Sequence, residues 1–391
     1  MKILCLFQRF SFRSSTIYLD LVDELVKKGH EVTVLAGTTE NHENGIQSEH
    51  GCRVVYQKLP DQFKAGKIKK GLVQLLMEPM MLHQVKKYLW KDSFDMILYP
   101  TPPITLANVV KKCRKHYGAL SYLMLKDIFP QNAVDLLMMR EGGFLHRYFK
   151  GVENQLYRVS DVIGCMSPAN IRYMEKVLSP EEHEKLELFP NTVRIKSLPE
   201  TNGCEKEKDI THFVFGGNLG KPQAVDFLLA GMEALNDYDR AKFLIIGDGT
   251  ESAFVEKYVR EHKLFHVEYH KELPREEYEE ILKMQDIGIV SLSPRFTIPN
   301  FPSRVLSYMQ MGKPVLAVTD ANSDIGEMIV KEAECGFFCP SDDISAFVRT
   351  IKEICENRGK LPLLGANGRR YLLEKYSVER SVAILESHKA R

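Results

Sequence analysis

Several features that mark particular classes of protein are absent from this sequence. Its eight cysteines form no C-x-x-C pair, and the nearest two, Cys335 and Cys339, have no histidine beside them, so we expect neither a disulfide framework nor a metal site. Dispersed cysteines are typical of a reducing cytoplasm. No apolar run reaches the roughly 18 residues of a transmembrane helix, and MKILCLFQRF predicts a first strand rather than a signal peptide. A net charge of +1 creates no field that would favour nucleic acid as a partner.

The chain instead alternates short apolar segments with amphipathic ones. A length of 391 residues predicts two domains. The strand KILCLF, the helical pattern of TIYLDLVDELVKKGH, which ends at Gly29, and the strand EVTVLAG form a βαβ unit and favour a parallel sheet. Further strands are predicted at DMILYP, LSYLMLKD, DVIGCMS, THFVFGG, KFLIIGDG, HVEYHK, DIGIVSLS, KPVLAVTD and CGFFCP. We therefore predict an α/β protein with two Rossmann-like domains whose parallel sheets face a central cleft, joined between Asn191 and Asp209.

A glycine-rich turn follows one strand of the second half. In FVFGGNLGKPQAVDFL, Gly216, Gly217 and Gly220 precede Lys221 and a helix-like segment. Glycine permits close backbone approach to a ligand, and such a turn directs free N–H groups and a helix dipole at an anion, which suits a phosphate. The spacing matches neither the Rossmann nor the P-loop fingerprint. A tight turn without a ligand is the alternative, but loops at the C-terminal ends of parallel strands converge where open sheets bind ligands.

A second anion-binding candidate lies in IPNFPSRVLSYMQMGKPVLAV. Pro302 suits the first turn of a helix, which would place Ser303 and Arg304 at its N-terminus, directed at an anion. A capped surface helix with a solvated arginine is the alternative. Because GGNLGK lies in the same predicted domain, we interpret the two segments as opposite sides of a diphosphate site.

Two segments of the first half invite functional interpretations. In LKDIFPQNAVD, Asp127 follows an apolar strand and is the best catalytic candidate; the alternative is an N-cap for the next helix. Between residues 63 and 90, lysines flank a Leu- and Met-rich stretch that ends at the only tryptophan. This stretch, with KKCRKH at 111–116, is predicted to contact an anionic membrane; ordinary helices with solvated lysines are the alternative.

Together these segments resemble retaining GT-B glycosyltransferases. GGNLGKPQ, IIGDG, PSRVLSYMQMGKPVLA and ECGFFCPSDD…YSVERSVA are similar to their C-terminal half. GHEVTVLAG, YPTPP and LKDIFPQNAVD are similar to the family 4-like subgroup that includes bacterial N-acetyl-L-fucosamine transferases. The resemblance covers nearly the whole chain. It implies an acceptor-binding domain at 1–195, a nucleotide-sugar-binding domain at 196–372, and a C-terminal helix at 373–391 that packs back on the first domain.

The resemblance also implies a reaction and a set of site residues. A sugar would pass from a nucleotide diphosphate donor, a UDP-sugar, to a lipid-linked or polysaccharide acceptor in bacterial surface glycan synthesis, with retention and without a metal or other cofactor. Asp127 would orient a hydroxyl or assist as base, while the leaving phosphate takes the acceptor proton. The implied location is the cytoplasm, at the inner face of the cell membrane. The donor-binding positions would be Ser14, Ser15, Gly217, Asn218, Gly220, Lys221, Gln223, Gly247, Asp248, Ser303, Arg304 and Ser307.

This chain departs from the family pattern at several of these positions. Many relatives carry glutamates where Pro299 and Ser307 stand, the latter holding both ribose hydroxyls, and the loss of such a charged hydrogen bond costs about 1.5–3 kcal/mol. Asn218 and Gln223 replace a widespread arginine and lysine, as they do in the narrower subgroup. Ser14 and Ser15 replace a glycine pair. The missing glutamates motivate a non-catalytic scaffold subunit as an alternative function, and a nucleotide-sugar 2-epimerase on the same fold is another.

Overall fold

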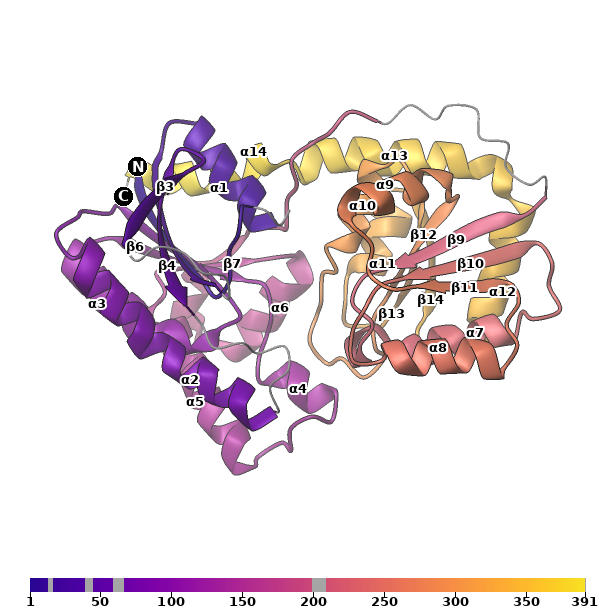
Figure 1. Ribbon diagram of the computed structural model, residues 1–391, viewed down its shortest axis with the longest axis horizontal. Coiled ribbons are helices and arrows are strands. Elements are labelled where there is room, and N and C mark those ends of the chain that lie inside the picture. Colours follow the sequence, from indigo (N-terminus) through magenta and orange to yellow (C-terminus); the bar gives the residue numbers. More distant parts are fainter. Residues whose placement is uncertain (13–16, 39–44, 59–66, 199–208, 391) are drawn as a thin grey trace. The chain divides into compact units, whose positions relative to one another are not determined.

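The computed structural model describes residues 1–12, 17–38, 45–58, 67–198 and 209–390, and it divides the chain into two compact units (Figure 1). The N-terminal unit comprises Met1–Arg194 together with Val378–Arg391. The C-terminal unit comprises Ile195–Ser377. The end of the chain is therefore part of the first unit, where α14 (Val378–Ser387) packs on α1 (Ile17–Lys27) and His30 contacts Glu386 at 2.9 Å.

The N-terminal unit is built on a sheet of strand order β3-β4-β2-β1-β5-β6-β7-β8. Neighbouring strands run parallel, apart from the antiparallel pair β3 and β4. Its strands are β1 (Lys2–Phe7), β2 (Glu31–Thr38), β3 (Ile46–Glu49), β4 (Cys52–Lys58), β5 (Met96–Pro100), β6 (Leu120–Leu125), β7 (Val162–Cys165) and β8 (Leu186–Leu188). Besides α1 and α14, its helices are α2 (Lys67–Gln84), η1 (Val85–Leu89), η2 (Ile104–Leu106), α3 (Ala107–Tyr117), α4 (Gln131–Asp135), α5 (Phe144–Val159), α6 (Pro168–Val177), η3 (Pro180–Lys185) and η7 (His388–Ala390).

The C-terminal unit has a fully parallel sheet of strand order β11-β10-β9-β12-β13-β14. Its strands are β9 (Thr211–Gly216), β10 (Ala241–Ile246), β11 (Val267–His270), β12 (Ile287–Ser291), β13 (Val315–Thr319) and β14 (Gly336–Pro340). Its helices are η4 (Lys221–Gln223), α7 (Val225–Glu233), α8 (Ser252–Glu261), α9 (Arg275–Met284), α10 (Arg304–Gln310), α11 (Ile325–Glu327), η5 (Met328–Glu332), α12 (Ile344–Glu356), η6 (Arg358–Lys360) and α13 (Leu361–Lys375).

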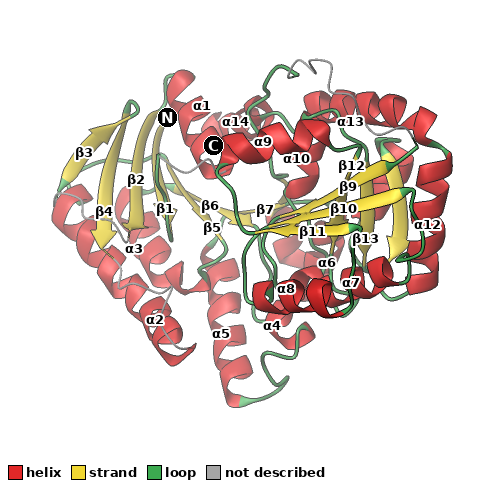
Figure 2. Ribbon diagram, turned by 45° about the vertical axis from the view of Figure 1, so that its right-hand side comes forward, coloured by secondary structure: helices red, strands yellow, loops and turns green. Residues whose placement is uncertain are grey.

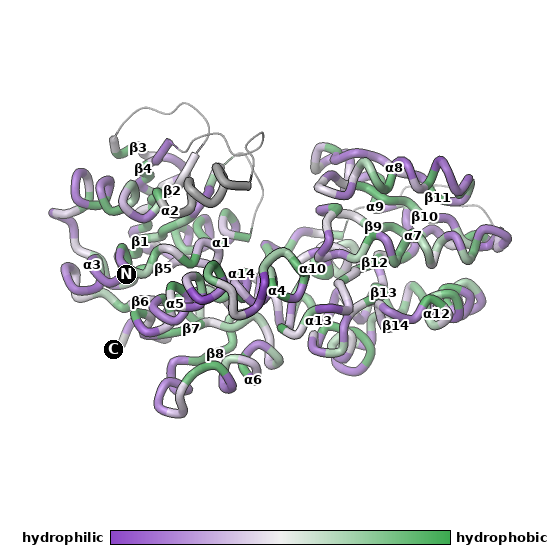
Figure 3. The backbone as a smooth tube through the Cα atoms, turned by 90° about the horizontal axis from the view of Figure 1, so that it is seen from below, coloured by the Kyte–Doolittle hydropathy of each residue, from purple (hydrophilic) through white to green (hydrophobic). Residues whose placement is uncertain are grey.

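Helices cover both faces of each sheet, as Figure 2 shows. Strands buried on both faces need apolar side chains on both, and the buried residues of β1, β5 and β13 are almost all apolar (Figure 3). Phe213 and Phe243 on neighbouring strands stack in the C-terminal core with ring centroids 5.1 Å apart. The predicted α/β fold with two mainly parallel sheets is confirmed. The strands β3, β4 and β8 were not predicted.

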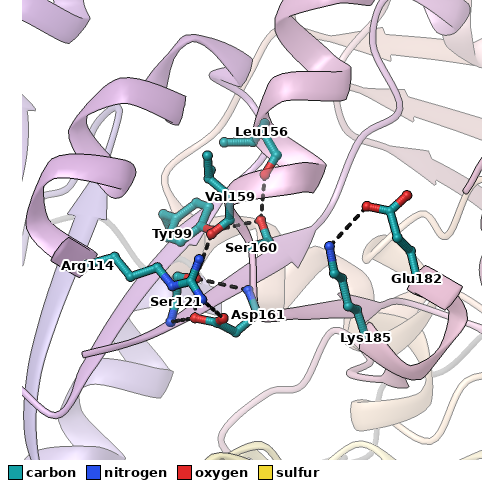
Figure 4. Close-up of polar contacts among 9 residues, drawn as sticks. All are labelled: Tyr99, Arg114, Ser121, Leu156, Val159, Ser160, Asp161, Glu182 and Lys185. Carbon is teal, nitrogen blue, oxygen red and sulfur yellow. Dashed lines mark hydrogen bonds and ion pairs between the residues drawn. The ribbon is translucent and has the colours of Figure 1, made fainter. Parts of the chain in front are cut away.

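A polar network closes the amino-terminal ends of β6 and β7 (Figure 4). Ser121 donates to the Asp161 carboxylate at 2.7 Å, and Arg114 of α3 forms an ion pair with the same carboxylate. The Tyr99 hydroxyl contacts Ser160 Oγ at 2.8 Å. These polar groups bond to one another at the amino-terminal ends of the strands, away from the carboxyl ends where open parallel sheets bind ligands. We therefore assign them a structural role.

The basic segment of residues 63–90 is packed into the unit where its side chains are described. Met77, Met81, Val85 and Leu89 follow one another at helical spacing and are fully buried. The only tryptophan, Trp90, stacks on His116 of α3, with the ring centroids 3.7 Å apart. Residues 77–90 therefore behave as an ordinary amphipathic helix. Residues 63–66, and the side chains of 67–75, lie outside the described part.

The cluster at 111–116 is likewise amphipathic. Cys113 is buried, whereas Lys111, Lys112 and Lys115 are exposed. None of the helices in the ranges given above is long and apolar enough to cross a membrane. Within those same ranges the cysteines are buried and unpaired, and no three His, Cys, Asp or Glu side chains gather as metal ligands.

Candidate functional site

The glycine-rich turn after β9 is held against the turn after β10. Gly217 has a φ of 141° and donates its N–H to the carbonyl of Ile246 at 2.9 Å, and the N–H of Leu219 binds the carbonyl of Asp248 at the same distance. A Cβ on Gly247 would lie 1.8 Å from the Gly217 oxygen, so only glycine fits there. The expectation that the turn presents free N–H groups is wrong for Gly217 and Leu219. These two N–H groups are therefore not available to an anion.

The other predicted turn residues fall into two groups. Asn218 donates to Gln223 Oε1 at 3.1 Å, and a Cβ on Gly220 would lie 2.9 Å from the Asn218 amide, so these residues close the turn on themselves. Lys221 is exposed and has no ion pair to any described carboxylate. Lys221 lies in the 3₁₀ turn η4, and Ala224, with a φ of 43°, separates this turn from α7.

Asp248 has a local role in the turn after β10. Its carboxylate accepts from the Gly249 N–H and from the Ser252 hydroxyl, both at 2.7 Å. These two hydrogen bonds hold the pKa of this exposed carboxyl below its ordinary value. Asp248 thus fixes the entry into α8, beside the glycine turn.

Arg304 lies directly against that turn. A Cβ built on Gly217 would be 3.5 Å from Arg304 Nη2, and the guanidinium sits over the Tyr278 ring, 5.1 Å from its centroid. No described carboxylate forms an ion pair with it. Arg304 opens α10 as predicted, whereas Ser303 precedes the helix without a side-chain cap bond. The fold therefore brings together two segments that are far apart in the sequence.

The rest of α10 anchors this arrangement. Val305, Leu306, Tyr308 and Met309 are fully buried, and the Tyr308 hydroxyl accepts from the N–H of Gly216 at 3.1 Å. Ser307 is half-buried and lies one turn after Arg304, on the same side of the helix. Tyr278 and Tyr308 were not predicted as site residues, since an aromatic residue at helical spacing is ordinarily a core residue.

A buried carboxylate supports the loop before α10. Asp320, at the end of β13, accepts from the Ser323 hydroxyl at 2.9 Å, and Ser323 Oγ in turn accepts from the N–H of Asn300 at 3.0 Å. Burial raises the pKa of the Asp320 carboxyl. The strand order places the β9 and β12 loops at the topological switch point, where open parallel sheets bind ligands.

A second group of residues surrounds Asp127 at the carboxyl end of β6, in the N-terminal unit. The Thr101 hydroxyl donates to the Asp127 carbonyl at 2.8 Å and accepts from the N–H groups of Lys126 and Asp127 at 3.0 and 3.1 Å. The peptide bonds before Pro102, Pro103 and Pro130 are cis. The loops after β5 and β6 are thereby tied together through one threonine.

The Asp127 side chain does not cap a helix. Both of its oxygens accept from Asn132 Nδ2 at 2.8 Å, whereas α4 has Pro130 at its N-cap position and no side-chain cap bond. The N-cap alternative is therefore wrong. Burial raises the pKa of the Asp127 carboxyl to about 6, against the opposing effect of hydrogen bonds from Ile128 and Asn132. Asp127 is thus a half-buried carboxyl that is mostly ionised at neutral pH.

Two other side chains near Asp127, those of Lys126 and Tyr18, also have shifted pKa values. Burial lowers the pKa of the Lys126 amine to about 7, and that amine donates to the Phe189 carbonyl at 3.3 Å. Burial and then the charge of Asp127 raise the pKa of Tyr18 above its ordinary value. Asn132 Oδ1 is buried and has no partner among the residues that the structure describes.

Thr101 and Asn132 lie inside the segments YPTPP and LKDIFPQNAVD, but the sequence did not predict them as site residues. Ser14 and Ser15 lie outside the described residues.

Comparison with solved structures defines the fold class. Sucrose-phosphate synthase from Thermosynechococcus elongatus superposes with a TM-score of 0.78 at 17% identity, covering 100% of this chain and 99% of that chain. Anabaena HepE in complex with UDP gives 0.69 at 15% identity over 100% of both chains. WaaG, described as a glycosyltransferase involved in lipopolysaccharide biosynthesis, gives 0.66 at 14% identity, covering 98% and 99%. The fold is the GT-B fold of glycosyltransferases.

Sequence comparison narrows this class. Residues 200–371 match the family model described as Glycosyl transferases group 1. The chain is 29% identical over 332 residues to the probable glycosyltransferase WbjE of Pseudomonas aeruginosa, covering 82% of this chain and 80% of that protein. The matched residues 200–371 include the glycine turn and Arg304.

Proposed function

We propose that this protein is a retaining glycosyltransferase of the N-acetyl-L-fucosamine transferase type. It moves a sugar from a UDP-sugar to a lipid-linked or polysaccharide acceptor during bacterial surface glycan synthesis, in the cytoplasm at the inner face of the membrane. The observation that carries the proposal is the guanidinium of Arg304 against Gly217, at the switch point of a parallel sheet. An arginine held there without a carboxylate partner in the described ranges is suited to the charge of a diphosphate.

The donor class rests on chemistry and on what similar proteins bind. Anabaena HepE was solved with UDP, and another similar structure, from E. coli, is bound with UDP-2-fluoro glucose. In this chain Arg304 and Lys221 supply the positive charge, because the N–H groups of Gly217 and Leu219 are already bonded. Two cations can balance a leaving diphosphate, so the proposal needs neither a metal nor another cofactor.

The acceptor step rests on Asp127. With a pKa of about 6, this carboxylate is ionised at neutral pH and can accept a hydrogen bond from the acceptor hydroxyl or a donor hydroxyl. The Asn132 amide nitrogen donates to both carboxylate oxygens of Asp127. The amide oxygen of Asn132, which is buried, can serve as a further hydrogen-bond acceptor. In a retaining reaction the leaving phosphate takes the acceptor proton, so Asp127 mainly orients.

Calorimetry on Arg304→Ala tests the diphosphate assignment. We expect UDP binding to weaken about 10- to 100-fold, the value of a charged hydrogen bond, while uridine binding stays unchanged. Arg349→Ala is the matched control, because that side chain is 70% exposed on α12. Equal losses for UDP and uridine would remove the phosphate role.

Turnover separates the enzyme from its alternatives. A panel of nucleotide sugars, screened for the one that raises the melting temperature, identifies the donor, which is then incubated with lipid-linked and glycan acceptors. Sugar transfer supports the proposal. Donor turnover without any acceptor indicates a 2-epimerase, and donor binding without turnover or transfer indicates a scaffold subunit.

A further inference from the structure

Apolar side chains are exposed together where α4 leads into α5. The exposed fraction is 76% for Leu137, 66% for Met138, 84% for Phe144, 59% for Leu145 and 45% for Tyr148. Single exposed apolar residues are common, but a cluster within one short segment marks an interaction site. We call residues 137–148 the α4–α5 tip.

The tip contributes little to the core of its own unit. The buried residues of α5 include Glu153 and Tyr157, and they lie on the side of the helix opposite Phe144 and Tyr148. The connection between the helices turns at Gly142, which has a φ of 67°. In Figures 1 and 2 this connection and the first turn of α5 project from the helical layer of the N-terminal unit.

Cations are interspersed with these apolar residues. Arg140 and Arg147 are exposed, and neither forms an ion pair with any residue the structure describes. Glu141 is the only carboxylate between residues 136 and 151. Lys150 is already paired with Glu153 at 2.7 Å. Figure 3 shows the resulting mixture of hydrophobic and hydrophilic positions around α4 and α5.

We propose that the α4–α5 tip docks on an anionic lipid surface. Phe144, Leu145 and Met138 enter the boundary between headgroups and acyl chains, while Arg140 and Arg147 contact lipid phosphates. A projecting segment with unpaired arginines fits a charged lipid surface, whereas a flat or grooved apolar face would fit a protein. The proposal rests on the membrane location in the proposed function and assigns that location to a specific surface; because lipid binding requires neither donor nor acceptor, it is tested separately from sugar transfer. It also identifies a surface distinct from residues 77–90, whose apolar face is buried.

Vesicle co-sedimentation of the full chain tests this surface. The parent should bind vesicles of phosphatidylglycerol and phosphatidylcholine, and bind pure phosphatidylcholine at least about tenfold more weakly. Phe144→Ser combined with Leu145→Ser should weaken binding to the anionic vesicles about tenfold or more. Arg140→Glu combined with Arg147→Glu should do the same, since each cation near such a surface contributes about fivefold.

Matched controls come from the C-terminal unit. Phe265 is 91% exposed and Arg260 is an exposed cation of α8, so Phe265→Ser and Arg260→Glu should leave vesicle binding unchanged. A second measurement uses Phe144→Trp, whose emission should shift to the blue with anionic vesicles, whereas that of Phe265→Trp should not. All substituted side chains are exposed, and thermal unfolding by circular dichroism verifies the fold.

Three results would overturn the proposal. The first is vesicle binding that survives both double substitutions. The second is an equal loss of binding in the Phe265→Ser control. The third is a parent that ignores vesicles but is dimeric, with Phe144→Ser making it monomeric, since the tip would then join two copies of the chain. Because no sugar donor is present, failure here would leave the proposed transfer reaction unaffected.

Discussion

Restoring a carboxylate at Ser307 is the sharpest test of how α10 meets the nucleotide. Ser307 is half-buried, one helical turn after Arg304, while its neighbours Leu306 and Tyr308 fill the core. The side chain at 307 therefore shares a helix face with the proposed phosphate contact. A glutamate there can accept from both ribose hydroxyls, where serine offers one weak contact.

The magnitude of the Ser307→Glu effect follows from two opposing terms. A hydrogen bond to a charged group is worth about 1.5–3 kcal/mol, but the carboxylate must lose water and side-chain freedom at a half-buried position. We expect a net gain of about 1–2 kcal/mol, which is about 5- to 30-fold tighter UDP binding. Ser307→Gln, of nearly equal size but neutral, should gain less and is the matched control.

The assay is calorimetric titration of parent and variants with UDP and with uridine in one buffer. If the new carboxylate binds the ribose, both ligands tighten. If it pairs instead with Arg304, three residues away on the same face, UDP binding weakens while uridine binding is unchanged. Weaker binding of both ligands by a folded variant would show that Ser307 does not face the ribose, and the alignment of PSRVLSYM would be abandoned. A scaffold subunit would gain nothing.

Further predictions concern both groups of residues. Asp127→Asn should lower turnover by about 10²-fold or more without unfolding the protein; an unchanged rate measured with donor and acceptor would refute its role. Transfer by the parent should fall as the pH drops through about 6, where Asp127 takes up its proton. Because that pKa lies above the ordinary 3.8, this carboxyl stabilises the fold below about pH 4 and loses that contribution as the pH rises through about 6, so Asp127→Asn should melt higher than the parent at pH 8. Gly247→Ala should cost about 2 kcal/mol or more of unfolding free energy through its clash with Gly217, whereas Gly359→Ala, with nothing within 4 Å, should cost little in the same denaturant titration.

The local order of this protein was readable from its sequence. Apolar runs such as KILCLF and THFVFGG predict strands covered on both faces, and Gly29, with a φ of 82°, lies in the turn directly after α1. Pro302 predicted the start of α10, and the glycines after FVF predicted the turn after β9. These features depend on neighbours within a few residues, so the chain specifies them before any long-range contact forms.

Long-range placement was decided only by the tertiary structure. The sequence suggested that GGNLGK and the segment around Arg304 form one site, but the contact of the Arg304 guanidinium with Gly217 follows from β12 pairing with β9, which brings their loops together. Likewise Thr101 is an ordinary polar residue until β5 and β6 become neighbours and its hydroxyl binds the backbone of Asp127. The burial of an apolar side chain also depends on long-range packing. The apolar residues around Met81 are covered by the rest of the N-terminal unit, whereas Phe144 is exposed. Periodicity reveals an apolar face, but only the assembled fold determines whether anything covers it.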